Sequence, residues 1–381
     1  TTTVSGDLVP SSQLSNRNMI INGGMTIWQR GTSSSAATSS LYPSADRWDL
    51  RISSAGAYET SREAIATSSD PAEEGHRYAF NIECTTSATL SGTNQVSLRT
   101  RLEGQDLQRI CKGTSAAKTV TLQFWVKSDT TGTYVVELFD GEGRVCAATY
   151  PISSASTWEK KTITFPVDTT GAIDNDNAAG LNVNFWLGVG SGLSSGTLQT
   201  TWGANSDVNR AAGQTVDLST DGRVWSITGV QLELGSNATP FEHRSYAEEV
   251  ARCQRYLCQF TSAVDRAWGK ASGSSDADCG WLTPVPMRAT PTFYAMDNLG
   301  LGWRVYQMTG DQVDDNTSSS GVNPVNAKIA GGTGRSIDNC AIYWKIDDCF
   351  SSLDDGTGLL VRNLMWRSGI NEIPLMIDAE L

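Results

Sequence analysis

The chain has 381 residues, and its 29 Lys and Arg against 41 Asp and Glu give a formal net charge of −12. This acidic balance excludes a nucleic-acid-binding protein that works by phosphate neutralisation, because counterion release needs a basic surplus. Hydrophobic residues make up 39%, which is enough for a core and excludes wholesale disorder. The 36 Gly and 12 Trp are more typical of β-sandwich domains than of metabolic enzymes.

Residues 1–17 are polar apart from one apolar cluster, Leu8, Val9 and Pro10, and they predict an extended arm. The arm lacks the basic and apolar regions of a secretory signal. No apolar run in the sequence approaches the ~18 residues of a membrane-spanning helix. We therefore expect neither secretion through a signal peptide nor membrane insertion.

From residue 18 to 243, short segments alternate between apolar and polar residues, which is the pattern of strands with one buried face. The alternation is clearest in residues 120–126, 134–139, 163–167, 181–189 and 230–234. Turn residues separate these segments, and only residues 102–111 suggest a short helix between them. Because parallel pairing needs crossover helices, the sequence predicts an antiparallel sandwich. Trp125, Trp186 and Trp225 are expected to point away from the apolar faces of their strands.

A single amphipathic helix is predicted at residues 244–258. Ser245 and Glu248 have the spacing of a capping box, and apolar residues recur at helical spacing from Tyr246 to Leu257. A second β-rich segment follows the helix. The expected organisation is an arm at 1–17, a sandwich at 18–243, a linking helix at 244–258 and a smaller C-terminal β domain at 259–381.

The sequence contains no recognisable catalytic constellation. His76 and His243 are the only histidines, and neither lies beside a nucleophile pattern. No phosphate-binding glycine motif is present, and the eight cysteines include no Cys-x-x-Cys pair, so we expect buried thiols and no zinc ribbon. We therefore predict a protein that is not an enzyme. Glycoside hydrolysis needs only two carboxylates, so a glycan-cleaving activity stays open as an alternative.

The candidate ligand-binding residues are tryptophans in polar loops. Trp202 is followed by Asn205 and Asp207, and Trp158 lies in a similar Ser-rich setting. A loop Trp beside such side chains can stack on a sugar ring and donate its N–H, so these residues predict a carbohydrate site. The alternative is a Trp that closes an edge of its own sandwich or contacts another subunit.

One oxygen-rich run, which includes Asp174 and Asp176, offers ligands suited to Ca²⁺. The run lacks the Gly and the distal Glu of an EF-hand loop, and a turn held by Asx hydrogen bonds is the alternative. We expect no other metal and no organic cofactor.

Short motifs are distributed along the chain from residue 18 to its end. They lie at residues 18–25, 28–31, 45–48, 230–242, 253–256, 286–292 and 378–381. In identity and spacing these motifs resemble the pattern of a family of bacteriophage tail-fibre and related virion-fibre proteins. The resemblance implies a jelly-roll domain like that of carbohydrate-binding modules, then a short helix and a smaller C-terminal β domain.

The resemblance also implies a function. The expected protein is a non-enzymatic, homotrimeric spike on the virion, in first place a tail fibre, that attaches to glycans on the host surface. Residues 1–17, with Leu8, Val9 and Pro10, would bind other virion proteins of the tail or capsid, after assembly in the host cytoplasm. The alternatives are a capsid-attached fibre or decoration protein without a specific ligand, a polysaccharide depolymerase, and a free lectin, against which the missing signal peptide argues.

Overall fold

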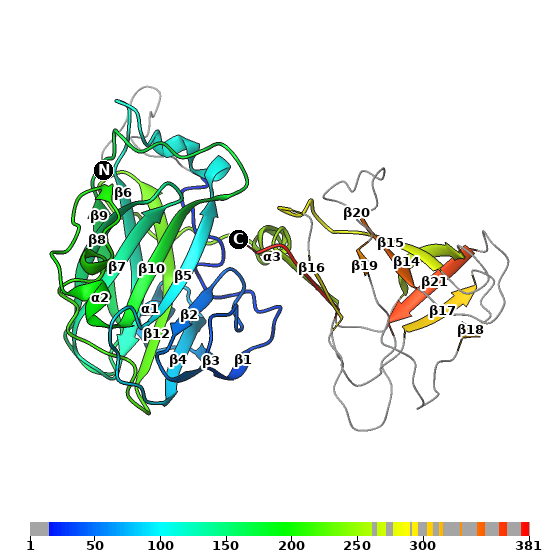
Figure 1. Ribbon diagram of the computed structural model, residues 1–381, viewed down its shortest axis with the longest axis horizontal. Coiled ribbons are helices and arrows are strands. Elements are labelled where there is room, and N and C mark those ends of the chain that lie inside the picture. Colours follow the sequence, from blue (N-terminus) through cyan, green and yellow to red (C-terminus); the bar gives the residue numbers. More distant parts are fainter. Residues whose placement is uncertain are drawn as a thin grey trace, which may run out of the picture. The chain divides into compact units, whose positions relative to one another are not determined.

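A computed structural model of the protein describes the backbone of residues 15–260, 265–271, 277–289, 292–295, 303–307, 312–314, 328–329, 341–346, 358–363 and 375–380. Side chains are described at 15–259, 283–289 and 379–380. The chain divides into two compact units, one that ends at Val250 and one from Ala251 to Glu380 (Figure 1).

The first unit consists of two six-stranded antiparallel sheets, which we call sheet A and sheet B. The strand order in sheet A is β1 (Ser33–Ala37), β3 (Ala57–Ala64), β4 (Tyr78–Thr86), β12 (Val224–Leu234), β6 (Val120–Ser128) and β9 (Glu159–Phe165). The order in sheet B is β11 (Gly203–Ala204), β8 (Arg144–Ile152), β7 (Gly132–Asp140), β10 (Ala179–Val189), β5 (Gln95–Glu103) and β2 (Asp49–Ser53). The predicted antiparallel jelly-roll sandwich is confirmed.

Helical turns in this unit are short. They are α1 (Asp70–Glu73), the 3-10 helix η1 (Gly104–Ile110), α2 (Ser191–Ser194) and the 3-10 helix η2 (Asp207–Asn209). The helix expected at 102–111 is thus a 3-10 helix, and Leu102 belongs to strand β5, where it pairs with Leu181 of β10. Sheet pairing decides that boundary, since tertiary contacts override local propensity.

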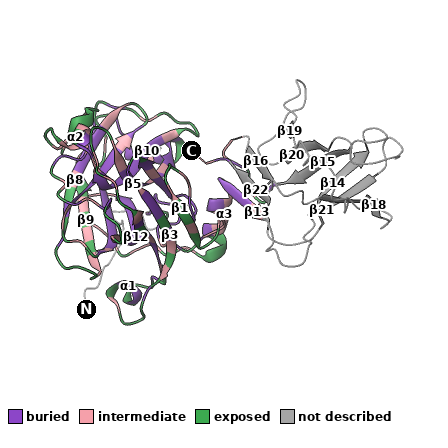
Figure 2. Cartoon of the chain, turned by 60° about the horizontal axis from the view of Figure 1, so that its bottom comes forward, coloured by how far each residue is buried: buried purple, intermediate pink, exposed green. Residues whose placement is uncertain are grey.

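The core lies between the two sheets, where the apolar side chains of alternating residues meet. Phe185 of β10 is fully buried, and its ring centroid lies 5.0 Å from that of Phe124 on β6 and 6.0 Å from that of Trp225 on β12. Figure 2 shows buried residues concentrated in the strands and exposed residues in the connecting loops. Such aromatic pairs add to the stabilisation from buried area.

One prediction about the tryptophans is wrong, and a bulge explains it. Trp125 and Trp186 lie outside the central core, as predicted, but Trp225 points into it with Ile227. The register of β12 against β6 shifts between Thr228 and Gln231, where Gly229 has φ +62°. The bulge reverses the alternation, so the odd-numbered side chains before it and the even-numbered ones after it share the core.

We expect replacement of Gly229 by Ala to lower the free energy of unfolding by roughly 2–3 kcal/mol, as measured by urea denaturation. A Cβ atom at this position would lie 2.7 Å from Nε2 of His76, in addition to the strain of its positive φ. Gly222 is the matched control because it has φ +78° and no heavy atom within 4 Å of such a Cβ. Gly222→Ala should lower the free energy of unfolding only by the strain of its positive φ, about 1 kcal/mol. Equal losses in the two variants would contradict the close contact between position 229 and His76.

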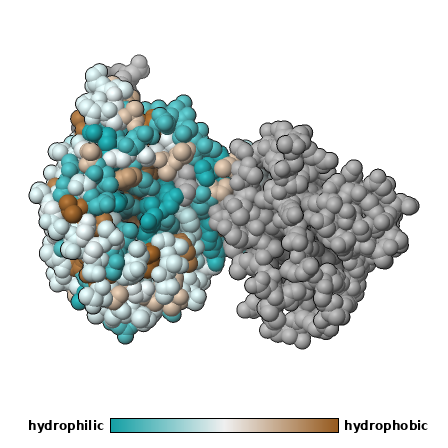
Figure 3. Space-filling view, in the orientation of Figure 1, coloured by the Kyte–Doolittle hydropathy of each residue, from teal (hydrophilic) through white to brown (hydrophobic). Residues whose placement is uncertain are grey.

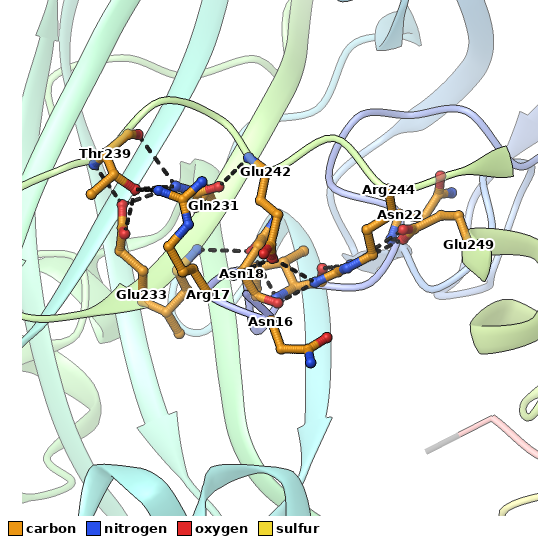
Figure 4. Close-up of polar contacts among 12 residues, drawn as sticks. Asn16, Arg17, Asn18, Asn22, Gln231, Glu233, Thr239, Glu242, Arg244 and Glu249 are labelled. Atoms are coloured by element: carbon orange, nitrogen blue, oxygen red, sulfur yellow. Dashed lines mark hydrogen bonds and ion pairs between the residues drawn. The ribbon is translucent and has the colours of Figure 1, made fainter. Parts of the chain in front are cut away.

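The motifs at residues 18–25 and 230–242, far apart in sequence, meet in the folded unit (Figure 4). The backbone N–H of Asn18 donates to the carboxylate of Glu242 at 2.9 Å, and the Asn18 side-chain amide donates to the carbonyl of Val230 at 3.1 Å. The N–H of Leu232 donates back to Asn18 Oδ1 at 3.2 Å. Asn18 therefore joins the segment that precedes β1 to the last strand of the sandwich.

Arg244 extends this network, which we call the clasp. Its guanidinium donates to the carbonyl oxygens of Asn18 and Ile20, and it lies 3.2 Å from the carboxylate of Glu249. Only 5% of the Arg244 side chain is exposed, so these charge-assisted hydrogen bonds are formed away from water. The contacts assign the two motifs an architectural role in closing the unit.

The linking helix is α3 (Tyr246–Gln254), which is shorter than the predicted 244–258. Its predicted cap is present, since Ser245 Oγ accepts the N–H of Glu248 at 3.2 Å. Leu257 lies in strand β13 (Leu257–Phe260) and pairs with Asp378 of β22 (Leu375–Asp378). Because the backbone of residues 257–260 pairs with β22, these residues cannot continue the helix, which ends before them.

The second unit is also β-rich and antiparallel, which confirms the smaller C-terminal β part of the predicted fold. One sheet has the order β13, β22 and β16 (Thr292–Ala295). The other has the order β18 (Gln312–Asp314), β17 (Trp303–Gln307), β21 (Gly358–Asn363), β14 (Asp265–Ala271), β15 (Ala277–Leu282), β20 (Ala341–Ile346) and β19 (Lys328–Ile329).

Two further observations concern the whole described part of the chain. None of its helices combines the length and the apolar character that crossing a bilayer would require. Cys84, Cys111 and Cys146 are free thiols, and of these only Cys111 is not buried. Cys253 and Cys258 are also buried. The other three cysteine side chains lie outside the described residues.

Candidate functional site

Trp202, the leading candidate from the sequence, lies at an edge of the sandwich. Its Nε1–H donates to the carbonyl of Pro166 at 3.0 Å, and the ammonium of Lys112 lies 4.5 Å from its ring centroid. The cavity beside it has a volume of about 10 Å³, room for roughly one water molecule. One face and the polar tip of this ring are therefore already occupied by the protein itself.

Lys112 belongs to a buried ion network that holds Trp202 in place. Its ammonium pairs with Asp140 and, at 3.0 Å, with Asp168, which also binds Arg144 at 2.7 Å. Burial alone would raise the pKa of Asp168, but hydrogen bonds from Arg144, Lys112 and Thr170 hold it well below its usual range. We therefore interpret Trp202 as a residue that closes an edge of its own sandwich, and the candidate site lies elsewhere in this unit.

The other residues of the predicted carbohydrate site do not assemble around Trp202. Trp158 immediately precedes β9, whereas Trp202 bonds to Pro166, immediately after β9; seven strand residues put these points about 20 Å apart. Lys127 lies 5.0 Å from the Trp158 ring centroid. Asn205 and Asp207 are exposed and hydrogen-bonded to each other at 3.2 Å.

The candidate calcium residues form a turn. Asp176 Oδ1 accepts the N–H of Ala178 at 3.0 Å, and the carbonyl of Asp174 accepts the side-chain amide of Gln108 at 3.2 Å. Within the described ranges, no group of three or more His, Cys, Asp or Glu side chains is arranged to hold a metal ion. Leu8, Val9 and Pro10, the predicted attachment residues, lie outside the described residues.

A different set of polar side chains gathers on the outer surface of sheet B. Its members alternate with core residues along four adjacent strands and carry mostly charge or amide groups. We call this set, together with the side chain that covers it from η2, the arginine face: Asp49, Arg51, Arg99, Arg101, Glu137, Phe139, Asn182, Asn184 and Arg210. Figure 3, in the orientation of Figure 1, shows a strongly hydrophilic area over these strands.

Strand register aligns these side chains in rows across the sheet. Asp49 is opposite Arg99, Arg99 is opposite Asn184, and Asn184 is opposite Glu137. A second row joins Arg101, Asn182 and Phe139 in the same way. Directly opposite residues on one face have Cβ atoms about 5 Å apart, so each row is a continuous strip of neighbouring side chains.

Two ion clusters organise the face. Asp49 binds Arg99 at 2.6 Å and Arg101 at 3.2 Å, and its side chain is only 7% exposed. Glu137, which is fully buried, binds Arg210 at 2.7 Å and accepts the amide of Asn184 at 2.8 Å. These pairs fix the orientation of three guanidinium groups at the surface of the sheet.

Arg210 also covers two rings, with its guanidinium carbon 5.2 Å from the ring centroid of Phe139 and 5.0 Å from that of Trp186. Burial alone would lower the pKa of Arg210, but its hydrogen bonds to Glu137 and the charge of that residue outweigh burial and raise it. Arg210 is therefore a firmly charged group stacked on an aromatic base.

Arg51 differs from the other arginines of the face. No hydrogen bond or ion pair joins its guanidinium to any other residue that the structure describes. Burial lowers the pKa of Arg51, the charges of Arg99, Arg101 and Arg210 lower it further, and Asp49 opposes them. The group nevertheless stays protonated at neutral pH because guanidinium is such a weak acid.

No residue of the arginine face was among the ligand-binding residues predicted from the sequence. A partial signal existed in the run from Leu181 to Leu187, where Asn182, Asn184 and Trp186 alternate with apolar residues that face the core. The partners of these residues come from β2, β5, β7 and η2, and only the strand order brings them together.

A second feature lies on the outer surface of sheet A. A hollow of about 320 Å³ is lined by polar residues of β1, β3 and β4. Glu59 and Glu83 are opposite each other in the register of β3 and β4, and both line this hollow and are exposed. Their side chains form the kind of carboxylate pair that an enzymatic alternative would need.

Comparisons with known proteins give similarities of structure. No protein-family model matches the chain, and neither does any curated protein. The enzymatically active domain of tailspike protein 4 from bacteriophage CBA120 is similar, with 13% identity over 57% of this chain and 21% of that one, and a TM-score of 0.30.

Two sugar-related proteins are similar to a comparable degree. The first is a putative sugar binding protein from Bacteroides thetaiotaomicron, with 12% identity over 57% of this chain and 100% of that one, and a TM-score of 0.32. The second is a family 11 carbohydrate-binding module from Clostridium thermocellum, with 11% identity over 54% of this chain and 98% of that one, and a TM-score of 0.26. At these scores the jelly-roll assignment rests on the strand order of the two sheets.

Proposed function

We propose that this chain is a bacteriophage virion fibre protein, in first place a tail fibre, whose jelly-roll unit attaches to host surface glycans without cleaving them. The observation that carries the proposal is the arginine face. Its guanidinium and amide groups offer paired donors to vicinal hydroxyls, and Phe139 adds apolar area beside them. Oriented donors beside a ring are the combination that sugar recognition requires.

The motif resemblance described above supports the virion part of the proposal. The motifs at 18–25 and 230–242 form the clasp that closes the jelly roll. The spacing of these motifs thus reflects the contacts that close the jelly roll. A chain with the same spacing is expected to close its jelly roll by the same contacts. Adhesion by such a fibre would depend on many weak contacts multiplied by valency.

Binding to an array of purified bacterial surface polysaccharides tests the glycan part. Phe139→Ala and Arg101→Gln should each weaken binding roughly tenfold, because the first removes apolar area of the face and the second removes a guanidinium donor whose side chain is partly exposed. Arg62→Gln, on the opposite sheet, is the control and should bind like the unchanged chain. Binding by the unchanged chain that neither face variant weakens would refute this location, and binding to no polysaccharide would refute the glycan part.

The proposed assembly is a homotrimer. Tyr246, the first residue of α3, is 71% exposed, which is unusual for a large aromatic side chain and suits a contact between copies. Sedimentation equilibrium should give three times the mass of one chain, and Tyr246→Ser should shift the equilibrium toward smaller species. A monomeric mass for the unchanged chain would refute the trimer.

The Glu59 and Glu83 pair keeps a second function open, a polysaccharide depolymerase. Carboxyl groups about 5 Å apart are typical of retaining glycosidases, and directly opposite strand residues have this order of separation. New reducing ends in the polysaccharides that the chain binds, lost on Glu59→Gln or Glu83→Gln, would establish the activity. A capsid rather than a tail position would be shown by labelled particles in cryo-electron microscopy.

A further inference from the structure

The feature that the proposed function leaves unexplained is the position of Arg51. It lies on β2 between the core residues Leu50 and Ile52, so its side chain projects from the outer surface of sheet B. The side chain is half-buried and, within the described part of the chain, its guanidinium donates to no acceptor. A partly desolvated cation normally has a hydrogen-bonded partner.

The neighbourhood of Arg51 cannot supply that partner. Three guanidinium groups and one carboxylate act on it electrostatically, and the carboxylate is Asp49. Asp49 is already engaged by Arg99 and Arg101. The second carboxylate of the face, Glu137, is engaged by Arg210 and Asn184.

The register places Arg51 beside the other donors of the face. Arg51 is opposite Ser97 of β5, whose short, uncharged side chain is no counterion for a guanidinium group. Arg99 lies two residues farther along β5, on the same surface. Arg51 and Arg99 thus present donors toward one region of the face, as the effect of Arg99 on the pKa of Arg51 also indicates.

The charge of the whole chain makes this cluster informative. With a net charge of −12, the protein repels anions at long range, so an anion would be held only by a dedicated local group of cations. A cluster of arginines with one member unpaired is such a group, because guanidinium binds carboxylate, sulfate and phosphate oxygens in bidentate fashion.

We propose that the arginine face binds a negatively charged glycan, with Arg51 as the residue that holds the carboxylate or sulfate oxyanion of the sugar. This inference rests on the proposed glycan-binding function and specifies its substrate class. Arg99, on the same surface of the adjacent strand β5, would supply the second donor.

Three matched pairs of polysaccharides test the inference: polygalacturonate and its carboxyl-reduced form, hyaluronan and its carboxyl-reduced form, and dextran sulfate and dextran. The full chain should bind the charged member of at least one pair roughly tenfold more tightly than its neutral partner at low salt. The uronate pairs and the sulfate pair distinguish the two sources of the oxyanion.

Arg51→Gln should abolish this preference. Arg62→Gln, which removes the same charge from β3 of sheet A, where Arg62 lies over the ring of Tyr78, should keep it. Equal binding of charged and neutral members by the unchanged chain overturns the inference but leaves glycan binding intact. A preference that survives Arg51→Gln also overturns it.

A second measurement uses inorganic sulfate as the probe and needs no glycan. Arg51→Gln should fold normally, because no described residue depends on Arg51 for a hydrogen bond. Sodium sulfate, compared with sodium chloride at equal ionic strength, should raise the melting temperature of the unchanged chain more than that of Arg51→Gln. The same increase in both proteins, together with no binding to any charged polysaccharide, would overturn the anion site.

Discussion

Asn22→Ala is expected to lower the free energy of unfolding by about 4 kcal/mol. Asn22 is fully buried, and its amide donates to the carbonyls of Ile27 and Asp46, both at 2.9 Å. Its side-chain oxygen accepts the N–H groups of Thr26 at 2.9 Å and Ile27 at 3.0 Å. Alanine would leave all these groups buried without partners.

Backbone conformation adds to this effect. Asn22 has φ +57°, a region that Asn tolerates far better than Ala does. Its own N–H donates to the carboxylate of Glu249, so a shift of the backbone would also disturb the clasp. Urea denaturation followed by tryptophan fluorescence measures the loss.

Asn175→Ala is the control for Asn22→Ala, since Asn175 is exposed in a loop and its replacement should change stability by less than about 0.5 kcal/mol. Asn22→Asp separates the two contributions, because it keeps the acceptor and the backbone preference but loses both donors. A loss below about 1 kcal/mol in Asn22→Ala would contradict the structural role of this residue.

The second large effect is a loss of stability in mild acid caused by His76. The pKa of His76 is lowered to about 4, mainly by burial and also by the charges of His243 and Lys160, whereas the charge of Glu74 opposes the shift. The ring is 2% exposed and packs edge-on against Phe241, with centroids 4.7 Å apart. Its Nε2 has no hydrogen-bond partner among the described residues.

The sign of the pH effect follows from linkage. The folded pKa lies below the value of about 6.5 in the unfolded chain, so the unfolded chain takes up the proton first as the pH falls. Stability contributed by neutral His76 is therefore present above pH 7 and is lost progressively down to about pH 4. From pH 7 to pH 5 the loss should be about 2 kcal/mol.

His76→Phe keeps an aromatic ring at this position but cannot titrate. Its stability should change little between pH 7 and pH 5, so the difference between the two proteins isolates His76. Asp168 and Glu242, whose pKa values are lowered, lose their contributions at more acidic pH and leave this window nearly undisturbed. Parallel pH profiles for the two proteins would contradict the assignment.

How well the sequence predicts this fold depends on whether the information is local. Alternation in residues 120–126 and 181–187 predicted strands with the correct buried face, because a strand's period of two is imposed by its own backbone. The capping box at Ser245 was likewise visible, since it is completed within four residues. The bulge at Gly229 could not be predicted, because a glycine in a strand pattern does not show by itself that the inward and outward positions are exchanged after it.

By itself, the sequence determined an acidic, antiparallel β protein with a short amphipathic helix, since composition and hydrophobic period depend only on neighbouring residues. Only the tertiary structure indicates the candidate site. Trp202, attractive as a loop aromatic, is occupied by Lys112 and Pro166, which come from distant loops. Arg51 and Arg99 come together because β2 and β5 are neighbours in sheet B, and Arg210, which follows η2, reaches the same face by binding Glu137 of β7. Strand order reflects the burial of the whole core rather than any local pattern.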